Sequence, residues 1–85
     1  MTFEFYGTIR LRAGVASTEI ESETLGQALQ RLAEALPALA NSVIFGDAVH
    51  RAFRASLNSE RFVSDPATPL ARGDRVLLVA ADVGG

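Results

Sequence analysis

The chain has 85 residues, 48% of them hydrophobic and 21% charged, a balance typical of one small folded domain and not of a disordered chain. A net charge of −2 argues against a nucleic-acid-binding protein, which normally carries a basic face. The absence of cysteine excludes disulfides, thiolate metal ligands and a cysteine nucleophile.

The N-terminal segment predicts two strands. Residues 3–11 alternate between apolar and polar side chains, which is the pattern of a half-buried strand; its apolar side carries Phe3, Phe5, Ile9 and Leu11. Gly7 lies on the apolar side and indicates a bulge or an early end of the strand. Ala13 and Gly14 predict a turn, and residues 15–21 weakly predict a second strand. Together they predict a hairpin.

The clearest element is a helix that begins at Thr24 and ends before Pro37. Thr24 and Gln27 have the spacing of a capping box, in which each side chain satisfies the other's free backbone N–H. The helical spacing of the following apolar residues predicts one buried face, formed by Leu25, Ala28, Leu29, Leu32, Ala35 and Leu36. Pro37 ends the helix because it lacks an amide donor and disfavours helix at the residue before it.

The second half predicts three more strands. Residues 38–50 are compatible with either a short helical turn or a loop. Residues 53–57 alternate as a strand does, Asn58 and Ser59 supply a turn, and residues 61–63 pair back. The prolines within 65–69 exclude regular structure there. A further tight turn at 72–74, in which Asp74 is expected to bind a backbone N–H, leads to a last strand over 76–80.

This order predicts an α+β fold in which one main helix packs on one face of a small mixed sheet. The last strand is apolar on both sides, so the other face of the sheet is either covered by a loop or exposes an apolar patch. Exposed patches of this kind usually mark a partner site, and the outward-facing Tyr6 could join it. We expect one domain over residues 1–81, followed by a flexible tail at 82–85.

The tail ends in Gly84 and Gly85. By average glycine usage, two terminal glycines arise by chance in about 0.5% of chains. Glycine lacks Cβ, so Gly84 and Gly85 predict a thin, flexible segment that can enter a narrow enzyme pocket. Asp82 and Val83 come directly before them and are expected to take part in this insertion. Its carboxylate becomes electrophilic only after activation, for example as an acyl-adenylate. The alternative is an ordinary frayed chain end.

The remaining features of the sequence give weaker indications of function. His50 is the only histidine and has no clustered ligands or carboxylates, so we expect neither a metal site nor acid–base catalysis there. No stretch is long and apolar enough to span a membrane and no signal peptide is recognisable, so we expect a cytoplasmic protein. All eight basic residues are arginine. One explanation is codon bias. The other is that a chain with an activated C-terminus benefits from lacking the nucleophilic amines of lysine, with which that terminus would react.

Several motifs together resemble the sulfur-carrier branch of the ubiquitin-like β-grasp superfamily. The matching segments are Phe5-Tyr6-Gly7, the Thr24-Leu25 helix start, Leu57-Asn58, and Leu70-Ala71-Arg72-Gly73-Asp74-Arg75-Val76 followed by the diglycine. The chain is most similar to the MoaD type, the small subunit of molybdopterin synthase, and next to the ThiS type of thiamine synthesis. The resemblance therefore implies a β-grasp fold.

The resemblance also implies a mechanism. An ATP-dependent adenylyltransferase of the ubiquitin-activating type (MoeB-like or ThiF-like) would adenylate Gly85, and a persulfide donor would convert it to a thiocarboxylate. The tail would then enter a large MoaE-like subunit, in a heterotetramer, and pass sulfur to a pyranopterin precursor. The chain would be a protein cosubstrate rather than an enzyme, with no bound cofactor. The partner interface implied by the resemblance includes Tyr6, Arg61 and Val79.

Two departures from the family pattern concern the partner. The family often has prolines just before the tail, where this chain has Ala80, Ala81 and the negatively charged Asp82. The family often has an aliphatic residue near Arg61, and an arginine there favours a partner with acidic residues. Sulfur delivery to thiamine, cysteine or a secondary metabolite remains an alternative, as do a ubiquitin-like modifier and a passive adaptor.

Overall fold

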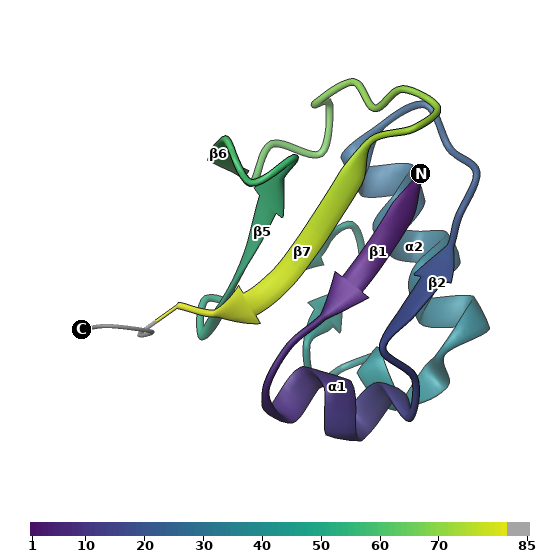
Figure 1. Cartoon of the computed structure of the whole chain (residues 1–85). Coiled ribbons are helices and arrows are strands. Elements are labelled where there is room, and N and C mark those ends of the chain that lie inside the picture. The colour runs from purple at the N-terminus through teal and green to yellow at the C-terminus, as the bar shows by residue number, and fades with distance from the viewer. Residues whose placement is uncertain (82–85) are drawn as a thin grey trace.

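The computed structural model describes residues 1–81 and shows a five-stranded mixed sheet with one long helix packed behind it (Figure 1). The sheet has the order β2-β1-β7-β5-β6, in which β1 and β7 are parallel and the other neighbours are antiparallel. Its strands are β1 (Thr2–Phe5), β2 (Ser17–Glu19), β5 (Phe53–Leu57), β6 (Arg61–Val63) and β7 (Arg75–Ala80). The remaining elements are α1 (Thr8–Ala13), α2 (Leu25–Ala35), the 3-10 helix η1 (Pro37–Leu39) and a two-stranded sheet of β3 (Ile44–Phe45) and β4 (Ala48–Val49).

The core lies between α2 and one face of the sheet. Alternate residues of the strands point toward the helix and are buried, as the period of two requires. Strand residues of this core are Phe3, Phe5, Ala55, Leu57, Val76 and Leu78, and they meet Leu25, Ala28, Leu29 and Leu32 of α2. The predicted α+β class, with one main helix on one face of a mixed sheet, is confirmed.

The predicted strand over residues 3–11 is wrong beyond Phe5. Gly7 adopts a positive φ of 60°, and the strand ends before it. Of the predicted bulge and the predicted early strand end, the structure has the early end. The chain then forms α1, whose Ile9 is buried while Leu11 is 82% exposed. Ile9 and Ala13 are four residues apart and share the inner side of the helix, whereas Leu11 lies on the other side. A helix thus stands between β1 and β2 in place of a tight hairpin.

The cap of α2 is close to the predicted capping box but shifted by one residue. Thr24 Oγ1 accepts a hydrogen bond from Gln27 N at 3.3 Å, as expected. The Gln27 side chain reaches back to Glu23 N at 3.1 Å instead of Thr24 N. Thr24 N, which would donate to the Gln27 side chain in a regular capping box, donates instead to Ser22 Oγ at 3.3 Å. The helix ends at Ala35, with Leu36 as its C-cap before Pro37.

The turns of the second half join β5 and β7 through polar side chains. Asn58 and Ser59 both adopt positive φ, near 55° and 59°, and β6 pairs back on β5 as predicted. The Asp74 carboxylate accepts from Ala71 N at 2.7 Å and from Asn58 Nδ2 at 3.0 Å, which confirms its predicted role in the turn. The hydrogen bond from Ala71, and then that from Asn58, hold the pKa of Asp74 below its ordinary value.

Candidate functional site: the open sheet face at the root of the tail

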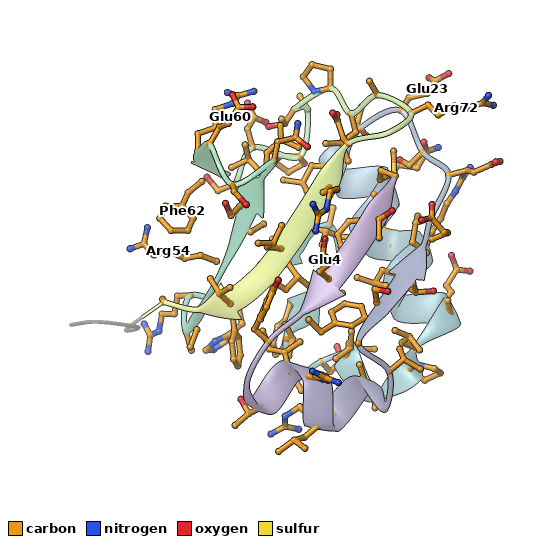
Figure 2. All side chains as sticks on the ribbon, viewed as in Figure 1. Glu4, Glu23, Arg54, Glu60, Phe62 and Arg72 are labelled. Carbon is orange, nitrogen blue, oxygen red and sulfur yellow. The ribbon has the colours of Figure 1, made fainter. Side chains whose placement is uncertain are left out.

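The face of the sheet opposite α2 is the candidate functional surface. In Figure 2 this face is turned toward the reader, and no helix or loop of residues 1–81 crosses in front of it. The register places Arg54 opposite Val79, and Ser56 opposite both Leu77 and Phe62. Because α2 occupies the other face, these side chains point outward. Of the two predicted outcomes for this face, the exposed patch is the one that the structure adopts.

Two aromatic side chains dominate the patch. Tyr6 is 47% exposed and follows β1, whereas Phe62 is 60% exposed and lies on the edge strand β6. A hollow of about 670 Å³ lies where these strands meet the end of β7; its lining is Tyr6, Gly7, Thr8, Arg54, Phe62, Val79, Ala80 and Ala81. We call it the tail-root hollow, because Ala81 is the residue directly before the tail.

Hydrogen bonds hold the end of β7 between its neighbours. Ala81 N donates to Ala52 O at 2.8 Å, and Tyr6 N donates to Leu78 O at 3.3 Å. These contacts extend the sheet to Ala81, the last described residue, which is part of the lining of the hollow. The predicted reactive residue Gly85 and the predicted insertion residues Asp82, Val83 and Gly84 lie outside the described residues.

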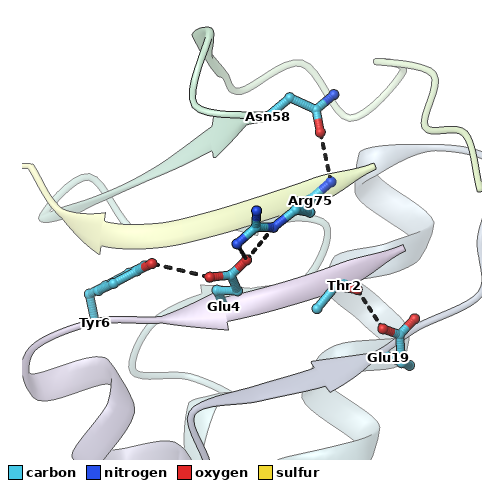
Figure 3. Close-up of polar contacts among 6 residues, drawn as sticks. All are labelled: Thr2, Glu4, Tyr6, Glu19, Asn58 and Arg75. Atoms are coloured by element: carbon cyan, nitrogen blue, oxygen red, sulfur yellow. Dashed lines mark hydrogen bonds and ion pairs between the residues drawn. The ribbon is translucent and has the colours of Figure 1, made fainter. Parts of the chain in front are cut away.

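A polar network on the same face orients Tyr6 (Figure 3). The Tyr6 hydroxyl donates to a Glu4 carboxylate oxygen at 3.1 Å, and the Arg75 guanidinium forms an ion pair with the other oxygen of that carboxylate. Arg75 N in turn donates to Asn58 Oδ1 at 2.8 Å. The hydrogen bond to Glu4 and the negative charge of Glu4 raise the pKa of Tyr6. Tyr6 therefore presents a neutral ring with a fixed direction at the edge of the hollow.

The structure brings Tyr6 and Val79 together but separates Arg61 from them. Arg61 lies opposite Leu57, whose side chain is buried on the helix side of the sheet, so Arg61 has the parity of that side. Phe62, which the sequence reasoning missed, occupies the open face instead. Parity counted from the buried Leu57 through the three-residue turn gives Arg61 the helix side and Phe62 the open face, so the sequence did hold a signal for Phe62.

The His50 side chain packs against two aromatic rings and accepts a backbone hydrogen bond. Its ring lies between Phe45 and Phe53, with centroid distances of 5.5 and 6.2 Å, and its Nδ1 accepts a hydrogen bond from Ala52 N at 3.0 Å. Within residues 1–81, no three side chains of histidine, aspartate or glutamate gather in a way that could hold a metal ion. Across the same residues, each helix is too short or too polar to cross a lipid bilayer.

No protein-family model matches the chain, and no curated protein matches it. Solved structures do match along almost the whole length. SAMP1 from Haloferax volcanii is 23% identical, with a TM-score of 0.77, over 99% of this chain and 97% of that one. One chain of the Amycolatopsis orientalis BexX/CysO complex is 17% identical, with a TM-score of 0.80, over 99% and 98%. The small archaeal modifier protein 1 (SAMP1) from Methanosarcina acetivorans is 18% identical, with a TM-score of 0.79, over 99% and 94%. These likenesses show that the fold is the ubiquitin-like β-grasp.

Proposed function

We propose that this chain is a sulfur-carrier protein whose Gly85 is adenylated and then converted to a thiocarboxylate. The observation that carries the proposal is the apolar tail-root hollow placed directly beside the strand that leads into the diglycine segment. A docking surface at that point lets a partner hold the domain while the tail enters its active site. The likeness to small β-grasp proteins, one of them in a complex, supports this reading.

The chemistry would proceed in three steps. The Gly85 carboxylate attacks the α-phosphate of ATP in an activating enzyme, forming the acyl-adenylate and releasing pyrophosphate. A persulfide then displaces AMP, and a thiol cleaves the resulting acyl disulfide to leave the thiocarboxylate. Activating enzyme and partner supply the catalytic side chains in this scheme, so the chain itself acts as a cosubstrate.

We further propose that the sulfur serves molybdopterin synthesis, with the chain as the small subunit of the synthase. Tyr6, Phe62 and Val79 would contact the large subunit, because all three line the tail-root hollow and the two aromatic side chains are exposed. Phe62 thus takes the place that the sequence reasoning gave to Arg61. The partner would decide the pathway, and sulfur delivery to thiamine, cysteine or a secondary metabolite is the alternative.

A ubiquitin-like protein modifier is the second candidate function. Three of the similar structures are of small archaeal modifier proteins, two of them from Haloferax volcanii, and the same activated glycine could acylate lysine side chains of other proteins. The chain has no lysine, so copies of it could not be joined through their own side chains. A modifier of this kind would be attached singly.

The intact mass of the protein tests the proposal. The protein is incubated with ATP, an activating enzyme and a persulfide donor, and a control carrier shows that the enzyme and the donor are active. We expect a mass gain equal to one sulfur in place of one oxygen, which is lost when Gly85 is deleted. The absence of a gain while the control carrier reacts overturns the sulfur-carrier proposal. Conjugates to lysines of other proteins would instead establish the modifier.

A further inference from the structure

The Tyr6 ring forms part of the wall of the tail-root hollow, but the backbone alone does not fix its direction. Tyr6 follows the last residue of β1, and its N–H donates to Leu78 O, which places it beside the end of β7. Tyr6 is 47% exposed, so packing against the core leaves its side chain free to choose among rotamers. A polar contact at the hydroxyl therefore decides where the ring lies.

Glu4 provides that contact from the same face of the sheet (Figure 3). The two residues are two positions apart, so both side chains point away from α2. One Glu4 carboxylate oxygen accepts from the Tyr6 hydroxyl at 3.1 Å, and the other accepts from Arg75 Nε at 2.5 Å. The Glu4 side chain is only 18% exposed, so its charge would be costly at this position without such partners. Glu4 thus holds an acceptor in a fixed place within reach of the phenol.

Arg75 is fixed from the other end of the face. It is a diagonal neighbour of Glu4, since Glu4 is opposite Leu77. Its backbone N donates to Asn58 Oδ1 at 2.8 Å, and its carbonyl accepts from Asn58 N at 2.7 Å. Asn58 Nδ2 in turn donates to the Asp74 carboxylate at 3.0 Å. A continuous series of contacts therefore runs from the turn after β5 to the wall of the tail-root hollow.

The stability of the fold explains little of this arrangement. The Arg75 side chain is 63% exposed, and ion pairs at such exposure contribute little to the free energy of unfolding. The Tyr6 hydroxyl could bond to water instead, so its hydrogen bond to Glu4 also adds little net stability. What the contact does remove is conformational freedom, from a ring that lines the same hollow as Ala81.

We propose that Glu4 and Arg75 are positioning residues for partner docking. They hold the Tyr6 ring in one direction, so a partner meets a wall of the tail-root hollow that is already formed and need not order the ring on binding. Neither Glu4 nor Arg75 is among the described residues that line the hollow, so both act through Tyr6. This role rests on the proposed carrier function and adds the side chains that prepare its docking surface.

Titration of the Tyr6 phenol tests the contact without any partner. The chain has one tyrosine, no cysteine and no lysine, so this phenol is the only side chain expected to titrate near its ordinary pKa of about 10. The hydrogen bond to Glu4 and the charge of Glu4 raise the pKa of Tyr6, so Glu4→Gln should shift the absorbance of the phenolate to lower pH. Glu19→Gln, which changes a carboxylate bonded to Thr2, should titrate as the wild type does. Identical titration of the wild type and Glu4→Gln would overturn the proposal.

Loading kinetics test the docking role, with the carrier as the varied substrate of an activating enzyme that is supplied with ATP and a persulfide donor. We expect Tyr6→Phe and Glu4→Ala each to raise KM about three- to tenfold, because the partner must then order the ring, and to leave kcat within about twofold. The double variant should raise KM no more than the larger single effect, because both changes remove one hydrogen bond. Glu4→Gln keeps an acceptor for the phenol, so its KM should return toward the wild-type value.

Two matched variants are the controls. Glu19→Ala removes the same charge as Glu4→Ala and also breaks a carboxylate–hydroxyl contact, with Thr2, on the same face (Figure 3). Arg72→Ala removes an exposed arginine, as Arg75→Ala does. We expect Arg75→Ala to raise KM, and both controls to stay within about twofold of the wild type. Thermal unfolding shows that each variant is folded.

The outcomes separate this role from the carrier function itself. A wild-type chain that the enzyme does not load contradicts the proposed function, and this role with it. Normal loading of the wild type with an unchanged KM in Tyr6→Phe, Glu4→Ala and Arg75→Ala contradicts the positioning role alone. Effects of Tyr6→Phe and Glu4→Ala that multiply in the double variant, or controls that raise KM equally, contradict it as well.

Discussion

The guanidinium of Arg54 lies over the ring of Phe62, with its central carbon 5.2 Å from the ring centroid (Figure 2). The two residues are diagonal neighbours on β5 and β6, since Phe62 is opposite Ser56. An exposed cation–π contact of this kind contributes about 0.5–1 kcal/mol. Both residues line the tail-root hollow, so the pair forms part of its wall.

Phe62→Asp tests the open face as a docking surface. Phe62 is 60% exposed, so we expect the free energy of unfolding to fall by about 1 kcal/mol or less, from the lost contact with Arg54. Docking should weaken much more, because truncated aromatic anchors commonly cost about 2 kcal/mol or more at an interface. Denaturant unfolding gives the first quantity, and the rate of sulfur loading or transfer at subsaturating partner concentration gives the second.

Leu11→Asp is the matched control for that substitution. Leu11 is still more exposed than Phe62, but it lies on α1 and does not line the tail-root hollow. We expect it to leave both the stability and the loading or transfer rate nearly unchanged. If both variants slow the reaction equally, the open face has no special role in docking.

Gly26→Ala should destabilise the protein although alanine favours helices. Intrinsic propensity alone would stabilise a helix interior by about 1 kcal/mol. The added Cβ would lie 2.8 Å from Pro66 Cβ and 3.2 Å from Pro66 O, and neither the ring nor the backbone can rotate away. We expect a net loss of about 1–3 kcal/mol, as in other overpacked sites. Thermal unfolding measures it, with the exposed Gln30→Ala on the same helix as the control; a more stable Gly26→Ala variant would show that the loop moves freely.

Asp74 should make stability depend on pH in the acidic range. Its pKa is lowered in the folded state, so its contribution is present above the ordinary pKa of 3.8 and is lost as the pH falls through the native pKa. Asp74→Asn should therefore be less stable than the wild type at pH 7, and the two should converge at lower pH. Urea unfolding across this range measures the difference. Asp47→Asn serves as the control for net charge, and a difference that grows on acidification would refute the assignment.

Gly84→Ala tests the tail. The added methyl group should hinder entry into a narrow pocket and slow sulfur loading or transfer about tenfold or more, since small displacements at a reacting centre are costly. The melting temperature should not change measurably. Intact-mass kinetics and thermal unfolding provide the two readouts. A large loss of stability at normal reaction rate would mean that this residue serves the fold instead.

The local patterns predicted the elements whose burial follows a regular period. The apolar residues between Leu25 and Leu36 predict a helix because their spacing matches one face at 3.6 residues per turn. Residues 53–57 predict a strand because their apolar and polar side chains alternate with a period of two. The same reasoning failed at residues 8–13. There Ile9 and Leu11 also fit an alternating strand, and only the positive φ of Gly7 and the docking of Ile9 into the core select the helix.

The sequence predicted that the candidate site is an apolar outer face of the sheet, but it did not predict all of the residues that form this face. Sequence reasoning anticipated an apolar outer face with Tyr6 and Val79, because one helix can cover only one side of a sheet. The resemblance to the family pointed to Arg61, whereas the register places Phe62 on this face, because a family pattern does not fix which residue of a short edge strand points outward. The network of Glu4, Tyr6 and Arg75 joins residues 71 positions apart, which no local pattern reveals.

By itself, the sequence determined the class of the fold, the main helix, the last strand and the chemistry available to the Gly84-Gly85 segment, because these depend on composition, period and residue type. Only the tertiary structure decided which side chains share a face and where β6 ends along β5. Those features arise from the parallel pairing of β1 with β7 and from the packing of the 64–69 loop onto α2. Contacts between distant segments set both, and the free energy of such contacts depends on the whole core.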